Sequence, residues 1–266
     1  MQTRKIYFDE TDKNAYLEAF SDGKKTTPRK AILIIPGGGY RRVAADREGG
    51  PVAEAFLAYG FVAFVLNYTV FEKPFPSHLI QASKAMKYIK DNKDVYGIDA
   101  ENVFVVGFSA GGHLAGSLGT MWDKKEIYDE IDMPFGYNKP KGMMLIYPVV
   151  SSKYKFHKPS FDSLLLDEDA PREKRKACSL EENVSKNTPP AFIMHTSNDE
   201  LVDVRNSLTL GAALKKHNIL FEMHIYPDAP HGVALANEIT MCDEEKWNNP
   251  HIAEWVKNAV YWAEHI

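Results

Sequence analysis

A serine flanked by two glycines is the first pattern in this chain that could carry chemistry. Gly107, Ser109 and Gly111 form a G-x-S-x-G sequence, preceded by the apolar run Val103–Val106 and followed by the helix-like stretch His113–Met121. A strand, a tight turn with serine at its apex and a helix make up a nucleophile elbow, in which small residues let the strand and the helix approach closely. The pattern therefore predicts a nucleophilic serine. A glycine-rich structural turn is the alternative interpretation.

A serine hydroxyl is a weak nucleophile near neutral pH, so Ser109 needs a general base. In enzymes built around such an elbow, the chain order is serine, then an acid, then histidine. Of the nine histidines, His231 follows the apolar run Phe221–Tyr226 in a loop rich in proline and glycine, and it is the predicted base. His195 is set aside because it lies within a predicted strand. His113 precedes every candidate acid, so we expect it to pack or hydrogen-bond beneath the elbow.

Three acidic residues follow the apolar run Ala191–His195, which is where the acid that orients the base should lie. Asp199 comes first after this strand, and its position favours it for the orienting role. Glu200 is adjacent and is expected to point elsewhere. Asp203 is better explained as the N-cap of the predicted helix Arg205–Lys216, and it is the alternative to Asp199.

Three consecutive glycines, Gly37 to Gly39, follow the predicted buried strand Lys30–Ile35. Acyl transfer needs N–H donors for the oxyanion, and these come from the residue after the nucleophile and from a glycine-rich loop after an earlier strand. Ala110 supplies the first N–H. The glycine loop supplies the others, because an oxyanion can approach backbone that carries no side chains. A phosphate-binding loop is excluded, since no Gly-Lys-Ser/Thr sequence follows.

The elements that must position these residues alternate along the chain. Short apolar runs are typical of buried strands, and apolar residues that recur every three or four positions indicate helices. Such alternation predicts an α/β fold, in which helices cover both faces of a mostly parallel sheet, as one domain over residues 1–266. The predicted strands are an edge hairpin of Ile6–Phe8 and Ala15–Phe20 and the buried runs Lys30–Ile35, Phe61–Asn67, Val103–Val106, Gly142–Tyr147, Ala191–His195 and Phe221–Tyr226, and the predicted helices include Glu48–Tyr59, Ser77–Asn92, Arg205–Lys216 and Ile252–Ile266.

One long segment interrupts the alternation. Residues 151–190 separate two predicted strands by far more than a crossover connection needs. An insertion of this length between core elements is typical of a lid or a binding loop, and the sequence predicts a lid here. The alternative is a solvated helical excursion that does not contact substrate.

Composition argues against several other classes of protein. The chain has 266 residues, of which 44% are hydrophobic and 26% charged, as in ordinary globular proteins. Its net charge of −4 gives no reason to expect nucleic acid or an anionic membrane as a partner. Two cysteines do not make a disulfide framework, and residues 1–10 lack an apolar signal region, so we expect a cytoplasmic protein. No cluster has metal-ligand spacing, and neither a metal nor a cofactor is expected.

Four motifs in chain order resemble those of the α/β-hydrolase esterases of the hormone-sensitive-lipase-like group. They are Pro36-Gly-Gly-Gly-Tyr40, Gly107-Phe-Ser-Ala-Gly-Gly112, Asn198-Asp-Glu-Leu-Val202 and Pro230-His-Gly232. Further short motifs, such as Asp46-Arg-Glu-Gly49, are similar to those of the bacterial branch described as acetylxylan or carbohydrate esterases. The resemblance covers nearly the whole chain.

This resemblance implies an α/β-hydrolase fold and hydrolysis of carboxylic esters without a cofactor. By similarity, the residues with roles in the reaction are Ser109, Asp199 and His231 as the catalytic triad, and Gly38, Gly39 and Ala110 around the oxyanion. One departure matters. Where many relatives carry His-Gly-Gly-Gly, this chain has Pro36, which lacks the imidazole that often braces the loop. Which glycine N–H groups point inward is therefore left open.

The same branch implies a small-molecule ester substrate with a short acyl group, such as acetyl on a sugar hydroxyl. Tyr40, Tyr68 and Phe108 are predicted to line the substrate pocket, although aromatic residues in such positions are more often part of the core. Two alternatives use the same arrangement of residues: an amidase or formamidase, and a ligand-binding pseudo-hydrolase. The oligomeric state, monomer or homodimer, stays open at this point.

Overall fold

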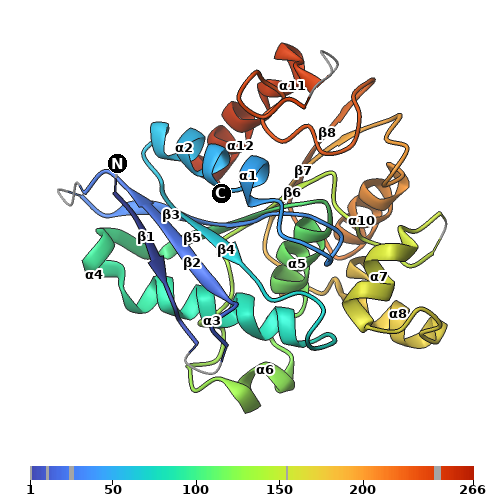
Figure 1. Cartoon of the computed structure of the whole chain (residues 1–266), viewed down its shortest axis with the longest axis horizontal. Helices are drawn as coiled ribbons and strands as arrows, with labels where there is room; N and C mark the ends of the chain where they lie inside the picture. The colour runs from blue at the N-terminus through green and yellow to red at the C-terminus, as the bar shows by residue number, and fades with distance from the viewer. Residues whose placement is uncertain (1, 10–11, 24–26, 154, 243–246) are drawn as a thin grey trace.

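A single sheet of eight strands forms the centre of the computed structural model, which describes residues 2–9, 12–23, 27–153, 155–242 and 247–266. The strand order is β1-β2-β4-β3-β5-β6-β7-β8 (Figure 1). β2 pairs antiparallel with β1 and β4, and all pairs from β4 through β8 are parallel. The strands are β1 (Gln2–Ile6), β2 (Tyr16–Ser21), β3 (Arg29–Ile35), β4 (Val62–Asn67), β5 (Ile98–Phe108), β6 (Met143–Ile146), β7 (Ala191–Thr196) and β8 (Phe221–Tyr226).

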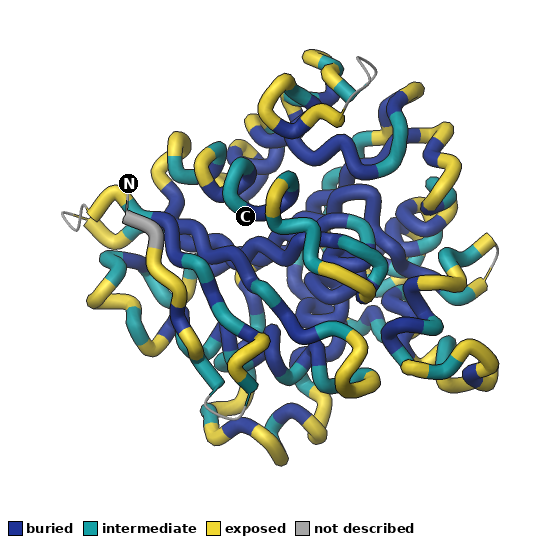
Figure 2. Tube along the Cα trace, in the orientation of Figure 1, coloured by how far each residue is buried: buried dark blue, intermediate teal, exposed yellow. Residues whose placement is uncertain are grey.

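Helices cover both faces of this sheet because both faces of its strands are apolar. Along β3, Leu33 belongs to one buried cluster and its neighbours Ile32 and Ile34 belong to another, since successive side chains of a strand point to opposite faces. Figure 2 shows the buried trace concentrated in the sheet and the exposed segments at the periphery. The first cluster includes residues of α3 (Ser77–Asp91), α5 (Ser109–Thr120) and α10 (Arg205–Lys216), and the second includes residues of α2 (Gly50–Ala58), α11 (Pro250–Ala253) and α12 (Trp255–Glu264).

The predicted fold class is confirmed, and the six predicted buried strands correspond to β3 through β8. The first edge strand was predicted too late in the chain. The expected strand was Ile6–Phe8, but β1 ends at Ile6, which pairs with Leu17 near the start of β2. Two short helices rich in charged residues, α4 (Lys93–Tyr96) and α6 (Lys125–Glu130), were not predicted.

The helix predicted at Glu48–Tyr59 is interrupted near its start. The structure has α1 (Ala45–Glu48), then Gly49, then α2. Pro51 in the first turn of α2 has no N–H with which to continue the hydrogen-bond ladder of α1. A Cβ at Gly49 would overlap the carbonyl oxygen of Ala45, so this tight junction requires glycine. The junction aims the side chain of Glu48 into the interior, where it is 5% exposed.

The insertion at residues 151–190 contributes three helices beside the carboxyl ends of the parallel strands. Figure 1 shows α7 and α8 at the opposite side of the molecule from the β1–β2 hairpin. Phe161, Leu164 and Leu180 anchor the insertion in the first cluster. The helices are α7 (Lys158–Leu165), α8 (Arg172–Cys178) and α9 (Leu180–Asn183). In the described part of the chain, no helix has both the length and the apolar character that a membrane span requires.

Candidate active site

Ser109 lies at the junction between β5, which ends at Phe108, and α5, which begins at the serine itself. Its φ is +52°, a left-handed conformation that costs energy for a residue with a side chain. The two flanking glycines allow this geometry. A Cβ at Gly107 would overlap the carbonyl oxygen of Gly111, and a Cβ at Gly111 would overlap that of Ile35. The predicted strand, turn and helix around the serine are therefore present.

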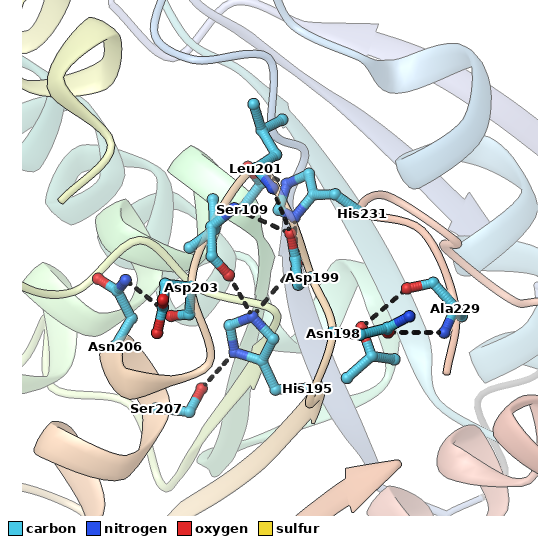
Figure 3. A network of polar contacts seen from close by, with 12 residues as sticks. Ser109, His195, Asn198, Asp199, Leu201, Asp203, Asn206, Ser207, Ala229 and His231 are labelled. Atoms are coloured by element: carbon cyan, nitrogen blue, oxygen red, sulfur yellow. Dashed lines mark hydrogen bonds and ion pairs between the residues drawn. The ribbon is translucent and has the colours of Figure 1, made fainter. Parts of the chain in front are cut away.

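The structure brings together the three side chains that the sequence separates (Figure 3). The imidazole of His231 lies between the other two, with Nε2 2.8 Å from Ser109 Oγ and Nδ1 2.6 Å from Asp199 Oδ2. Because an ionised carboxylate only accepts hydrogen bonds, Nδ1 carries the proton and Nε2 is free to accept the serine hydroxyl proton. This is the tautomer that a general base requires.

Asp199, which lies in the loop after β7, accepts hydrogen bonds from four donors. Its Oδ1 accepts the backbone N–H groups of Leu201 and Val202 at 2.9 and 2.8 Å, and its Oδ2 faces the imidazoles of His231 and His195. Burial alone would raise the pKa of this carboxyl, but the hydrogen bonds from the two histidines and from Val202 outweigh burial and hold its pKa well below the usual range. Asp199 is therefore a carboxylate at neutral pH.

His195 is a site residue that the sequence analysis missed. It was set aside because it lies in β7, yet its side chain is fully buried and its Nε2 lies 3.2 Å from Asp199 Oδ2. The available signal was a polar residue at the end of an otherwise apolar strand, four positions before the acid. His195 holds the acid from beneath the loop.

The glycine loop holds two backbone donors that have no protein partner among the described residues. Gly37 N–H donates to the carboxylate of Glu48 at 2.7 Å. Gly38 and Gly39 have φ values of +119° and +68°, and within the described ranges neither of their N–H groups has a protein acceptor. Ala110 lies in the first turn of α5, where a backbone N–H has no acceptor within the helix.

The three aromatic residues predicted to line the pocket are instead in the core, so that prediction was wrong. Tyr40, Tyr68 and Phe108 are each at most 2% exposed. The two tyrosine hydroxyls are used inside the protein: that of Tyr40 lies 2.8 Å from His113 Nδ1, and that of Tyr68 donates to the Pro36 carbonyl at 3.0 Å. Tyr40 has a φ of +58°, and its ring packs among the buried His78, His113 and Tyr68 rather than beside Ser109.

A cavity of about 420 Å³ opens beside Ser109 and His231. His157 and Pro159 of the insertion line it, so the insertion is not a solvated excursion remote from the site. The insertion is also tied to the glycine loop, because Arg41 Nε donates to Ser163 Oγ at 3.1 Å. Other lining residues, to which the sequence analysis gave no role, include Arg41, Arg42, Arg47, Glu48, Leu201 and Trp247.

Two residues that competed for roles in the sequence have other partners. His113 is fully buried and its Nε2 lies 2.7 Å from the carbonyl oxygen of Cys178, in agreement with the expectation that it packs beneath the elbow. The carboxylate of Asp203 accepts the backbone N–H of Arg205 at 2.9 Å and pairs with its guanidinium. Val204, not Asp203, is the N-cap residue of α10.

Within the described ranges, no group of three or more His, Cys, Asp and Glu side chains is placed to hold a metal ion.

Comparison with known proteins identifies the family. The BD-FAE family profile matches residues 17–214 of this chain. The chain belongs to the BD-FAE family. This is an α/β-hydrolase esterase family, so the resemblance noted in the sequence is confirmed, and the expectation of a carboxylic ester hydrolase is confirmed at the level of the family.

Curated relatives of this BD-FAE member include proteins whose names refer to xylan. It is 36% identical over 216 residues to endo-1,4-beta-xylanase B of Butyrivibrio fibrisolvens and 28% identical over 207 residues to an acetylxylan esterase of Xylanibacter ruminicola. These matches cover 79% and 76% of this chain but only 33% and 41% of the two relatives. The chain thus spans less than half the length of these relatives.

Solved structures give matches over nearly the full length. The acetyl ester-xyloside bifunctional hydrolase of Caldicellulosiruptor lactoaceticus is 32% identical with a TM-score of 0.85, over 98% of this chain and 95% of that one. A sugar hydrolase (YeeB) of Lactococcus lactis is 31% identical with a TM-score of 0.81, over 99% and 97%. This BD-FAE member therefore shares its whole architecture with these hydrolases.

Proposed function

We propose that this protein is a serine esterase that hydrolyses short-chain carboxylic esters through an acyl-enzyme. The observation that carries the proposal is the continuous hydrogen-bonded path from Ser109 Oγ through His231 to the carboxylate of Asp199. Such a path activates a serine hydroxyl for attack on a carbonyl. It opens onto a cavity, so the nucleophile can meet a ligand from solvent.

In the proposed reaction, His231 Nε2 takes the hydroxyl proton as Ser109 Oγ bonds to the ester carbonyl carbon. The carbonyl oxygen becomes an oxyanion and is bound by the backbone N–H groups of Gly38, Gly39 and Ala110. His231 then gives the proton to the leaving alkoxide as the carbon–oxygen bond breaks. A water molecule then bonds to the acyl carbon as His231 takes one of its protons. The bond from that carbon to Ser109 Oγ breaks, and the imidazole returns the proton to the serine as the acid leaves.

We further propose an acetyl ester of a sugar as the substrate class. Support comes from the relatives, since one is named as an acetylxylan esterase and another as an acetyl ester-xyloside bifunctional hydrolase. The cavity also offers features that suit a sugar. Trp247 presents an aromatic surface beside Arg47, whose guanidinium lies 4.5 Å from the ring centroid, and Arg41 and Arg42 supply further hydrogen-bond donors.

The deciding experiment is labelling with a fluorophosphonate probe together with hydrolysis of p-nitrophenyl acetate. We expect the wild-type protein to be labelled and active, and Ser109→Ala to lose both properties while it keeps its thermal midpoint. Unchanged turnover in Ser109→Ala would overturn the serine mechanism. Faster cleavage of a matched acetanilide than of the ester would favour an amidase. If acetylated xylo-oligosaccharides react no faster than simple acetate esters, then the proposed substrate class, an acetyl ester of a sugar, is wrong.

A further inference from the structure

A buried carboxylate links the glycine loop to the histidine loop. Glu48 Oε2 accepts the N–H of Gly37 at 2.7 Å, and Oε1 accepts the hydroxyl of Tyr147 at 2.9 Å. The same hydroxyl accepts the N–H of Ala234 at 2.9 Å. Three hydrogen bonds thus run from the loop after β3, past the end of β6, to the loop after β8 that carries His231.

The direction of these hydrogen bonds defines the protonation of the carboxyl. The N–H groups of Gly37 and Ala234 can only donate, so the hydroxyl proton of Tyr147 must go to Glu48. Both oxygens of Glu48 therefore accept, and the ionised form satisfies this pattern fully. Burial raises the pKa of Glu48, and the hydrogen bonds from Gly37 and Tyr147 oppose that rise. Glu48 and Tyr147 are 5% and 1% exposed, so water does not replace either partner easily.

Each end of this link lies next to a reacting group. Gly37 directly precedes the two glycines whose N–H groups have no protein partner in the described chain. At the other end, the ring of Tyr147 meets that of His231 edge-on with centroids 4.9 Å apart. Pro36 has neither an N–H nor a polar side chain, so it cannot brace the glycine loop itself. Its carbonyl is held by the Tyr68 hydroxyl instead.

We propose that Glu48 and Tyr147 are positioning residues that set the separation between the oxyanion donors and the imidazole of His231. The inference rests on the proposed function, because it concerns the geometry of that reaction. Displacement of reacting groups by about 1 Å can cost about 10²-fold in rate. Glu48 lines the cavity beside Ser109, but both of its carboxylate oxygens accept hydrogen bonds within the link, and Tyr147 is not among the lining residues. Their effect should therefore appear in kcat and not in KM.

The test compares Glu48→Gln and Tyr147→Phe with wild type, using Ser83→Ala as the matched control. Glutamine has the shape of glutamate but only one accepting oxygen for two donors. Phenylalanine keeps the ring beside His231 but removes the hydroxyl and leaves the N–H of Ala234 unpaired. Ser83 is also fully buried, and its substitution removes the hydrogen bond that Ser83 Oγ accepts from Asn138 Nδ2 at 3.1 Å. Ser83 is not among the residues that line the cavity beside Ser109.

We expect kcat on p-nitrophenyl acetate to fall by about 10- to 100-fold in Glu48→Gln and by about threefold to tenfold in Tyr147→Phe, with KM within about twofold of wild type. Affinity for a trifluoromethyl ketone, which forms a tetrahedral adduct with the serine, should fall in proportion to kcat. Ser83→Ala should keep both values. If Glu48→Gln does not fold, the test is the comparison of Tyr147→Phe with Ser83→Ala.

A folded variant whose kcat matches that of Ser83→Ala overturns the inference, and so does a change confined to KM. The proposed function fails in a different way. If wild-type hydrolysis is absent, or is the same in Ser109→Ala, then the serine mechanism is wrong, and this inference falls with it.

Discussion

His195 Nε2 lies 3.2 Å from Asp199 Oδ2, the same oxygen that His231 Nδ1 approaches to 2.6 Å (Figure 3). The carbonyl oxygen of Val202 lies 2.9 Å from the same Nε2. Both neighbours can only accept, so Nε2 carries a proton, and Nδ1 accepts the hydroxyl proton of Ser207 at 2.7 Å. A histidine from the strand thus fixes the carboxylate that orients the histidine from the loop.

From this contact we expect His195→Leu to lower kcat/KM for a short acetate ester by roughly tenfold, in line with a hydrogen bond to a charged group. Asp199 keeps three other donors, so the loss should be partial. Ser207→Ala should lower kcat/KM less, because it keeps the Nε2 proton facing Asp199. Steady-state kinetics and thermal midpoints on both variants check this expectation. An unchanged kcat/KM in folded His195→Leu would contradict it.

The two candidate acids can be separated by a matched pair of substitutions. Asp199→Asn places an amide where His231 Nδ1–H needs an acceptor, and a loss of roughly 10³- to 10⁴-fold in kcat is expected. Asp203→Asn weakens the pairing with Arg205, which lies outside the triad, and should change kcat by less than about twofold. Single-turnover kinetics on an aryl acetate measure both effects. A larger loss in Asp203→Asn would reassign the acid.

The sequence was sufficient to predict the elbow and the convergence of the site. The turn at Ser109 depends on neighbours within two positions, so its pattern is local. Asp199 and His231 each follow a parallel strand, and the carboxyl ends of parallel strands meet at one edge of a sheet. Their approach to Ser109 therefore followed from the topology, although the distances did not.

What the sequence did not reveal depends on the direction of side chains and on contacts between distant positions. The side chain of Tyr40 points into the core and contacts His113, 73 positions away, so it does not line the cavity. Glu48 meets Tyr147, 99 positions away. The Asp46-Arg-Glu-Gly49 motif marked the first member of that pair, but nothing local indicated the second.

Two buried histidines make the fold sensitive to acid. Burial lowers the pKa of His113 to about 4, and burial together with the nearby His113 lowers the pKa of His78 to about 4. In the unfolded chain each binds a proton near pH 6.5, so between these values the unfolded state holds more protons and stability falls as the pH falls. The stability that depends on each histidine being neutral in the folded state is fully present above about pH 6.5 and is lost progressively toward pH 4. For one imidazole this loss is on the order of 3 kcal/mol.

Denaturant unfolding at pH 7 and at pH 4.5 measures this sensitivity. His113→Gln should be less stable than wild type at pH 7 and should lose less stability on acidification, because one of the two groups no longer titrates. His265, which is exposed, provides the control, and His265→Gln should leave the wild-type difference between the two pH values unchanged. An identical difference in His113→Gln and in wild type would contradict the assignment.

The two glycines proposed to bind the oxyanion should respond differently to alanine. Both have positive φ, so each substitution costs about 1–2 kcal/mol of stability from backbone strain. A Cβ at Gly39 meets only Ser160 Oγ at 3.9 Å, so the turn should hold and kcat should fall by less than about tenfold. A Cβ at Gly38 would overlap the carbonyl oxygen of Arg42 within the same turn, which must then open and displace its N–H. Loss of one oxyanion donor typically costs about 10²–10³ in kcat, and we expect that loss for Gly38→Ala. Equal kcat values for the two folded variants would exclude the Gly38 N–H as a donor.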